Sequence, residues 1–327
     1  MFGESHLMWR PILRSAAFAS LYLISGQGQP CCVVSEGSPV LMTQENALIV
    51  WDEKSRTEHF VRQVDFDAKA RTFGFIVPTK SVPELALVDS KIMNSVNRFV
   101  SKQMRPKISM SCSADHMPLQ KSVEILKTEL LGDYKATVVK ATDGASLDRW
   151  LKSNGFVSRP AMVPWLDYYA ARGWVFTALK YNGTLGKPTV THAIRLSYKT
   201  DKPYFPWKMP SDTFAPGWIR TVNIAVISAT PMKGRMSDGS AWDGKVQWSG
   251  DCGAAAKVWC DQLGLPEGSL GPAPVLTSFV NGRNEKGFDL DLSFEPDPKP
   301  NWIPIGLGAL AVFVARRVMR RRRAVAP

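Results

Sequence analysis

Alternating apolar and polar positions predict several β-strands along this chain. In the run HFVRQVDFDA, Phe60 and Phe66 share an apolar face, which Arg62 interrupts. The run TFGFIVP follows after a short connection, so we expect the two to pair as a hairpin. Asp289 and Asp291 lie on the polar face of FDLDLSF, the last expected strand. Strands are also expected at YKATVVK, WVFTALKY, THAIRLSYKT and TVNIAVISA.

Spacings of three and four residues between apolar side chains predict amphipathic helices elsewhere. The first helix is expected to open at VPEL, and its apolar positions are Leu85, Val88, Ile92, Val96 and Phe99. Asp143 stands at the N-cap of a second helix, and Gly155 stands just past its end. Shorter helices are expected over residues 164–172 and 252–263.

Together these elements predict a mixed α+β fold, mainly antiparallel strands with two or three covering helices, plus one C-terminal transmembrane helix. The glycine-rich segment 231–251 is expected to be an irregular loop. Its Trp242 and Trp248 are expected to pack, with sugar or partner binding as the alternative. The proline-rich stretch 203–216 is expected to be a loop or an extended edge.

The beginning of the chain has the order of features found in a secretory signal. Arg10 and Arg14 precede SAAFASLYLISG, an apolar run of 12 residues, and small residues follow it. This order predicts a signal peptide that is removed after Gly28. An amphipathic first helix and an uncleaved anchor are the alternatives.

The end of the chain has the features of a membrane span. Residues 302–315 are an uncharged run of 14 residues, and arginines follow. At about 1.5 Å per residue the run covers roughly 21 Å of a bilayer core about 30 Å thick. Snorkelling of the next two arginines extends the buried length to Met319, and basic flanks stay in the cytoplasm. A processed bacterial sorting signal is the alternative.

The expected organisation of the chain follows from these two ends. Everything between residues 29 and 301 is expected outside the cytoplasm, in the periplasm or cell envelope. The parts are a signal peptide (1–28), an α+β ectodomain (29–230), its C-terminal extension (231–296), a spacer (297–301), a transmembrane segment (302–319) and a basic cytoplasmic tail (320–327).

The positive charge of the chain does not indicate nucleic-acid binding. Of the net charge of +12, six charges lie in the last twelve residues and one in the first 28, which leaves +5 for residues 29–315. No basic run with interleaved aromatic residues occurs in that central part, so no nucleic-acid partner is expected.

Sequence motifs for common enzymes are missing. No C-x-x-C, H-E-x-x-H, G-x-S-x-G, Walker A or G-x-G-x-x-G motif is present, and no cofactor is expected. Cys112 and His116 stand four residues apart and would share one face of a helix. A metal needs further ligands, and none is near in sequence, so no metal site is expected.

The polar residues of EHFVRQ and the prolines after it are the candidates for a partner surface, made of His59, Arg62, Pro78 and Pro83. A purely structural interpretation is that His59 faces solvent and Arg62 pairs with a carboxylate at a sheet edge. A functional one is a ligand or partner site, because an arginine on a rigid strand presents a fork suited to carboxylates.

Five cysteines in an exported chain suggest two disulfides and one thiol, or one disulfide and three thiols. The candidates are Cys31, Cys32, Cys112, Cys252 and Cys260. Adjacent cysteines seldom bond to each other, so the first two are expected to meet separate partners. The last two are eight residues apart, about 12 Å in one continuous helix, which is too far to bond unless the helix is broken.

Several segments together resemble a known family, the bacterial domain of unknown function 2330, in its cysteine-pair type. They are CCVV, IVWDEKSRTEHFVRQVDF, FGFIVPTKSVPEL, SLDRWLKSNGF, YYAARGWVFTALK and IRLSYKTDKPYFPW, which span roughly residues 31 to 230. The resemblance implies an exported protein with a C-terminal membrane or sorting segment, and no known reaction. Residues 70–72 replace the acidic pair found before FGF in that family, so no acidic site is expected there.

The sequence therefore favours a non-enzymatic binding or structural protein of the cell envelope. Its expected partners are the membrane, through the C-terminal helix, and an envelope protein or ligand of unknown identity. The alternative is an envelope enzyme with a redox or hydrolytic thiol, in which Cys32 is the nucleophile and His59 the base.

Overall fold

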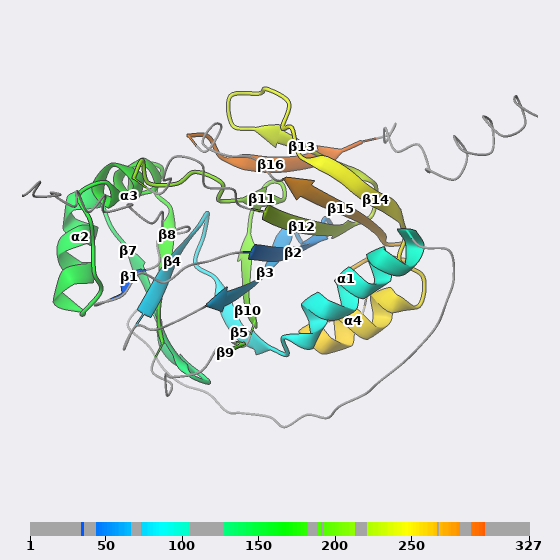
Figure 1. Ribbon diagram of the computed structural model, residues 1–327, viewed down its shortest axis with the longest axis horizontal. Coiled ribbons are helices and arrows are strands. Elements are labelled where there is room, and N and C mark those ends of the chain that lie inside the picture. Colours follow the sequence, from blue (N-terminus) through cyan, green and yellow to red (C-terminus); the bar gives the residue numbers. More distant parts are fainter. Residues whose placement is uncertain are drawn as a thin grey trace, which may run out of the picture.

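The computed structural model describes residues 34–35, 44–66, 73–104, 127–181, 189–190, 193–212, 221–266, 268–281 and 289–297. Within these ranges, four helices accompany three β-sheets (Figure 1).

The largest sheet has the strand order β14-β15-β12-β2-β3-β10-β5, and β9 pairs with the far end of β3. Its neighbours are antiparallel except β12 and β2, which run parallel. The strands are β2 (Gln44–Asp52), β3 (Thr57–Phe66), β5 (Glu84–Val88), β9 (Thr189–Val190), β10 (Ala193–Lys199), β12 (Thr221–Ser228), β14 (Lys245–Asp251) and β15 (Val275–Asn281).

Two smaller antiparallel sheets accompany the large one. The five-stranded sheet has the order β1-β4-β8-β7-β6, and the three-stranded sheet has the order β11-β16-β13. The five strands are β1 (Val34–Ser35), β4 (Phe73–Thr79), β6 (Lys127–Leu131), β7 (Tyr134–Lys140) and β8 (Val175–Tyr181). The three are β11 (Tyr204–Phe205), β13 (Met232–Met236) and β16 (Leu292–Pro296).

The helices cover the outer faces of this arrangement (Figure 1). Helices α1 (Lys91–Met104) and α4 (Ala255–Leu263) share an apolar cluster with one face of the large sheet. Helices α2 (Gly144–Ser153) and α3 (Met162–Ala170) share another with the five-stranded sheet. A third and larger cluster joins the three sheets and includes Phe60, Phe75 and Phe294. The large sheet is therefore buried on both faces.

The expected α+β class, mainly antiparallel strands and the second helix are confirmed. The Asp143 carboxylate accepts the Ser146 N–H at 2.7 Å, which is the N-cap contact that the sequence predicts. Gly155 has a φ of +71°, as expected for the residue after the helix. Trp242 and Trp248 pack against the two main clusters.

The predicted hairpin between HFVRQVDFDA and TFGFIVP is wrong. Strand β3 pairs with β2 and β10 in the large sheet, whereas β4 pairs with β1 and β8 in another sheet. Each strand has apolar side chains on both faces: Phe60 and Val61 on β3 lie in different clusters, as do Ile76 and Val77 on β4. A two-stranded hairpin cannot cover both faces, so each strand lies between two layers.

The expected start of the first helix is also wrong, because VPEL leads into strand β5. Leu85 and Val88 belong to that strand, and the helix begins at Lys91. The Asp89 carboxylate accepts the Lys91 N–H at 2.9 Å and marks the change from strand to helix.

Residues 231–251 are not an irregular loop, since they contain β13 and β14. Strands β14 and β15 lie in the same sheet as β12, so the segments 29–230 and 231–296 share one sheet. Asp291 is not on an exposed face either. It is buried before β16 begins, and it accepts the Tyr169 hydroxyl at 2.7 Å and the Lys208 N–H at 3.1 Å.

No helix within the described residues is long and apolar enough to cross a membrane. The predicted signal peptide and the predicted span at 302–319 lie outside the described residues.

Candidate functional site

Three connections meet at one end of the large sheet and form what we call the loop rim. They are the β2–β3 turn (residues 52–57), the β4–β5 loop (80–83) and the β10–β11 connection (199–203). The strand register requires this meeting, because Lys199 lies opposite Thr57 on β3 and β5 begins beside the same end of β10. The rim is the loop surface that flanks the sequence-predicted candidates.

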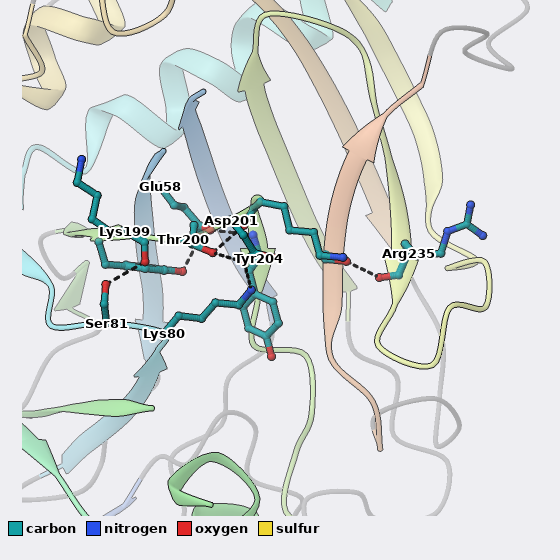
Figure 2. Close-up of polar contacts among 11 residues, drawn as sticks. Glu58, Lys80, Ser81, Lys199, Thr200, Asp201, Tyr204 and Arg235 are labelled. Carbon is teal, nitrogen blue, oxygen red and sulfur yellow. Dashed lines mark hydrogen bonds and ion pairs between the residues drawn. The ribbon is translucent and has the colours of Figure 1, made fainter. Parts of the chain in front are cut away.

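Hydrogen bonds hold the three connections together (Figure 2). The Lys199 ammonium donates to the carbonyl oxygen of Ser55 at 2.7 Å. The Ser81 hydroxyl donates to the carbonyl oxygen of Lys199 at 2.9 Å. The Thr200 N–H donates to the carbonyl oxygen of Arg56 at 3.1 Å. Each loop therefore has at least one hydrogen bond to another loop, which limits their independent motion.

Lys80 adds an ion pair to the rim. Its ammonium lies 2.7 Å from the Asp201 carboxylate and 5.3 Å from the centre of the Tyr204 ring. Figure 2 shows the Lys80 side chain pointing towards these two residues. The hydrogen bond from Lys80 lowers the pKa of Asp201. Asp201 is more than half exposed, so the pair contributes at most about 1 kcal/mol to stability and serves mainly to orient the loop.

Glu58 lies beneath the rim and is fully buried on the face of β3 that meets the other sheets. Its carboxyl group accepts the Tyr198 hydroxyl at 2.8 Å and the Tyr204 N–H at 2.7 Å. Burial raises the pKa of Glu58 to about 8, although both hydrogen bonds oppose that change. The side chain is therefore a neutral acid at pH 7, and it fastens β11 to β3 and β10.

His59 lies on the opposite face of β3, under α4. Its Nδ1 lies 2.8 Å from the Ser197 hydroxyl. The side chain is buried, so the structural interpretation that placed it in solvent is wrong. Burial, together with the nearby Arg195 guanidinium, lowers the pKa of His59 to about 4. The imidazole is therefore neutral at pH 7.

Arg195 connects this face of β10 to the C-terminal end of α4. Its Nη1 donates to the carbonyl oxygen of Leu263 and, at 3.2 Å, to that of Gly264. Glu84 lies 3.4 Å from Nη2. A cation at this position is favourable, because the last carbonyl groups of a helix carry partial negative charge. Glu84, His59, Ser197 and Arg195 thus lie on one face of three adjacent strands.

Arg62 is buried in the interior and not at a sheet edge. Its guanidinium lies 2.9 Å from the Glu45 carboxylate, and the two side chains are 3% and 0% exposed. Pro78 and Pro83 are buried as well. The four residues predicted as a partner surface are therefore all buried, and His59 and Arg62 are buried because both faces of β3 are covered. The exposed positions are in the loops beside them.

The cysteine predictions divide into two groups. Cys252 and Cys260 are both free, and burial raises the pKa of the Cys252 thiol to about 12. Cys31, Cys32 and Cys112 lie outside the described residues, as does His116. Their disulfide partners and the Cys32–His59 pair therefore stay predictions. Among the described residues, no group of three or more His, Cys, Asp or Glu side chains could hold a metal ion.

A pocket of about 410 Å³ lies beside the start of α2, lined among others by Lys140, Ser146 and Trp150. The first N–H groups of that helix are already occupied. Asp143 accepts the Ser146 N–H, and Asp167 accepts the Gly144 N–H at 3.0 Å. The helix start therefore has no free N–H pair there for an anion.

Glu58, Ser197 and Arg195 were missed as candidates from the sequence. A signal for Glu58 was present, because the alternation that places Phe60 on the core face also places Glu58 there. No local signal marks Ser197 and Arg195. They matter only because β10 pairs with β3 and passes under α4.

Replacement of His59 by glutamine is expected to remove the loss of stability in acid that this one site contributes. The unfolded imidazole binds a proton near pH 6.5 and the folded one near pH 4, so stability is fully present above 6.5 and falls as pH decreases towards 4. Each pH unit in that window costs about 1.4 kcal/mol. Urea unfolding from pH 4 to 7.5 measures this slope. An unchanged slope in His59→Gln would show that another group carries it.

Comparison with known proteins places the chain in a family. The family model described as "uncharacterized protein conserved in bacteria (DUF2330)" matches residues 27–269. A search of the curated proteins found no match. The crystal structure of baculovirus P35 is similar with a TM-score of 0.39 at 9% identity, and it covers 80% of this chain and 96% of that one. A mutated baculovirus P35 after caspase cleavage gives 0.36 at 9%, covering 76% and 95%.

The family match extends beyond residue 230 into β14, α4 and the turn after it. The matched range of residues 27–269 also includes all three loops of the rim, Glu58 and His59. This chain belongs to the bacterial DUF2330 family.

Proposed function

We propose that this chain is a membrane-anchored, extracytoplasmic protein of the bacterial cell envelope that binds a partner without catalysing a reaction. Membership of a family conserved in bacteria supports the bacterial part of this proposal. The signal-like residues 1–28 and the apolar residues 302–319 support export and anchoring. The contact surface in this proposal is the loop rim.

The observation that carries the proposal is the contrast between the base of the rim and its outer side chains. The base is held by the buried Glu58 and by hydrogen bonds between the loops. The outer side chains of Lys54, Arg56, Val82 and Lys202 are exposed. A surface that is already ordered loses little conformational entropy on binding, so this arrangement favours recognition.

Arg56 gives further support, because its backbone has a φ of +52°. A non-glycine residue in the left-handed region is uncommon and costs of the order of 1 kcal/mol. Its carbonyl group is held by the Thr200 N–H, and its side chain is exposed. Such outliers cluster at binding and catalytic sites.

The buried ionisable groups next to the rim favour binding over catalysis. Glu58 and His59 are each engaged by a neighbouring side chain and shielded from solvent. A general acid or base must reach the proton that it transfers. In this proposal they hold the strands that position the loops.

Membrane extraction of the full chain tests the anchoring. We expect the chain to remain with the membrane fraction after alkaline extraction, and Leu310→Arg to release most of it. An arginine at the centre of a span costs about 2.5–3.5 kcal/mol in insertion. Leu310→Ile keeps the apolar character and is the matched control.

A reporter fused after Pro327 tests the orientation. We expect activity from a reporter that works in the cytoplasm and none from a reporter that works only outside it. Release of the unmodified chain by extraction, or a reporter active only outside the cytoplasm, would contradict the proposed function.

A further inference from the structure

We propose that the loop rim lies against the anionic headgroups of the membrane that the C-terminal segment enters. This inference rests on the membrane anchoring proposed above, and it names the partner of the same surface. It depends on where the chain leaves the fold, on the length of the connection and on the side chains found at that end.

The chain leaves the fold beside the rim. Strand β16 is antiparallel to β11, with Ser293 opposite Tyr204, and the Phe294 N–H donates to the carbonyl oxygen of Pro203 at 2.9 Å. Residues after Phe294 therefore run along the chain that leads back towards Lys202. Asp297, the last described residue, is three positions beyond Phe294.

A second set of contacts locates the exit at the same end of the large sheet. The Asp297 N–H donates to the carbonyl oxygen of Pro231 at 2.7 Å, just after β12 ends. Strand β12 runs parallel to β2, with Ile227 opposite Val50. The ends of β12 and β2 therefore lie together, and the β2–β3 turn of the rim follows directly from β2.

The connection to the apolar segment is short. Trp302 lies five positions after Asp297, and a fully extended chain of that length spans at most about 18 Å. Three of the residues from 296 to 300 are prolines, which favour a semi-rigid extended chain. A membrane entered at Trp302 is therefore within about 18 Å of Asp297, which lies beside the rim.

The exposed side chains of the rim suit the surface of an anionic lipid bilayer. Lys54, Arg56 and Lys202 are exposed and form no ion pair within the described residues. Val82 is 55% exposed and is one of the few large apolar side chains so exposed in the described part of the chain. Glu53 and Asp201 are the exposed acidic side chains of the rim, and Asp201 is paired with Lys80. Cations near an anionic bilayer contribute about 1 kcal/mol each, and an apolar side chain can enter the headgroup layer.

Lipid-attached quenchers test this contact in the full chain. The chain, with its C-terminal segment, is reconstituted into phosphatidylglycerol vesicles that carry nitroxide-labelled lipids. An environment-sensitive fluorescent amino acid replaces Val82 in one preparation and Leu130 in another. Leu130 is 60% exposed and is the matched control. Thr79, which leads into the β4–β5 loop of the rim, and Lys140 are both paired with Val175, so they mark the end of the five-stranded sheet that is near the rim. Leu130 is paired with Lys135, towards the other end of that sheet.

We expect strong quenching at position 82 and little at position 130. The combined substitutions Lys54→Glu, Arg56→Glu and Lys202→Glu should reduce the quenching at position 82. Each lost cation should lower the ratio of docked to undocked chains by about fivefold or more. Arg98→Glu, Lys135→Glu and Lys245→Glu change the charge equally at exposed positions elsewhere and should leave it unchanged. Phosphatidylcholine vesicles should behave like the rim variant.

The outcomes separate the two proposals. Equal quenching at both positions in chains that float with the vesicles would overturn the docking of the rim and leave the anchoring intact. Chains that fail to float with vesicles would overturn the anchoring itself. Quenching at 82 that does not depend on lipid charge or on the three cations would overturn the headgroup recognition.

Discussion

Replacement of Glu58 by glutamine is expected to increase the free energy of unfolding by several kcal/mol at pH 8. The carboxyl group ionises near pH 4.5 when unfolded and near pH 8 in the folded protein. Between these values the unfolded state binds fewer protons, so stability decreases as pH rises, by about 1.4 kcal/mol per pH unit. This contribution is fully present below pH 4.5 and lost by about pH 8. Glutamine does not ionise and removes the slope.

The geometry allows glutamine to keep the contacts of the neutral acid. Its amide oxygen can accept the Tyr204 N–H, and its amino group can donate to the Tyr198 hydroxyl oxygen. Urea unfolding of both proteins from pH 4.5 to 8.5 gives the difference in stability at each pH. Glu53→Gln, at an exposed site, is the matched control. Parallel pH profiles for the parent and Glu58→Gln would show that Glu58 is ionised in the folded state.

Glu58 and His59 oppose each other in the same pH range. As the pH falls from 6.5 to 4.5, the contribution of His59 to the stability of the protein decreases while that of Glu58 increases. The parent protein is therefore expected to have a nearly flat profile in that window, and each single variant should reveal the slope of the other residue. This comparison distinguishes the two assignments within one set of measurements.

Replacement of Glu45 by glutamine is expected to destabilise the protein by about 3 kcal/mol or more. The substitution keeps the shape but removes the charge that faces Arg62 at 2.9 Å. The Arg62 Nη2 atom makes this ion pair, and the buried Nε atom has no hydrogen-bond partner within the described residues. The charge of Glu45 is therefore the main compensation for a buried guanidinium, and its loss leaves that cation in an apolar core.

A double variant identifies the cause of this loss. Arg62→Met combined with Glu45→Gln removes both charges and keeps a long apolar side chain, so it should recover at least about half of the stability lost by Glu45→Gln. Urea denaturation at pH 7 with an unchanged m-value measures both. A double variant as unstable as the sum of its single variants would show that Glu45 acts through its other contacts.

The strand that carries these residues shows how far local pattern extends. The alternation in HFVRQVDF correctly predicts a strand and the interruption of its apolar face by Arg62. It does not indicate what covers the other face, and His59 was therefore assigned to solvent. Helix α4 covers that face through the contact of Arg195 with Leu263, which is 68 residues further along the chain. Periodicity reports which residues share a face, and burial depends on distant segments.

The helices show the same division. Asp143 and Gly155 act through residues within a few positions, so capping is readable from the sequence. The segment VPEL has helical spacing, yet it pairs with β10 because an edge position of the large sheet is available there. The glycine-rich residues 231–251 have weak local preference, and only the pairing of β13 with β16 and of β14 with β15 makes them strands.

By itself, the sequence determined the α+β class, the family, the second helix with its caps and the apolar character of the two ends. These properties depend on composition and on neighbours in the chain. Only the tertiary structure decided that His59, Arg62, Pro78 and Pro83 are interior, that Glu58 lies beneath three joined loops and that β16 ends beside them. Those features arise from strand pairs separated by more than a hundred residues, and local spacing carries no information about which strands will meet.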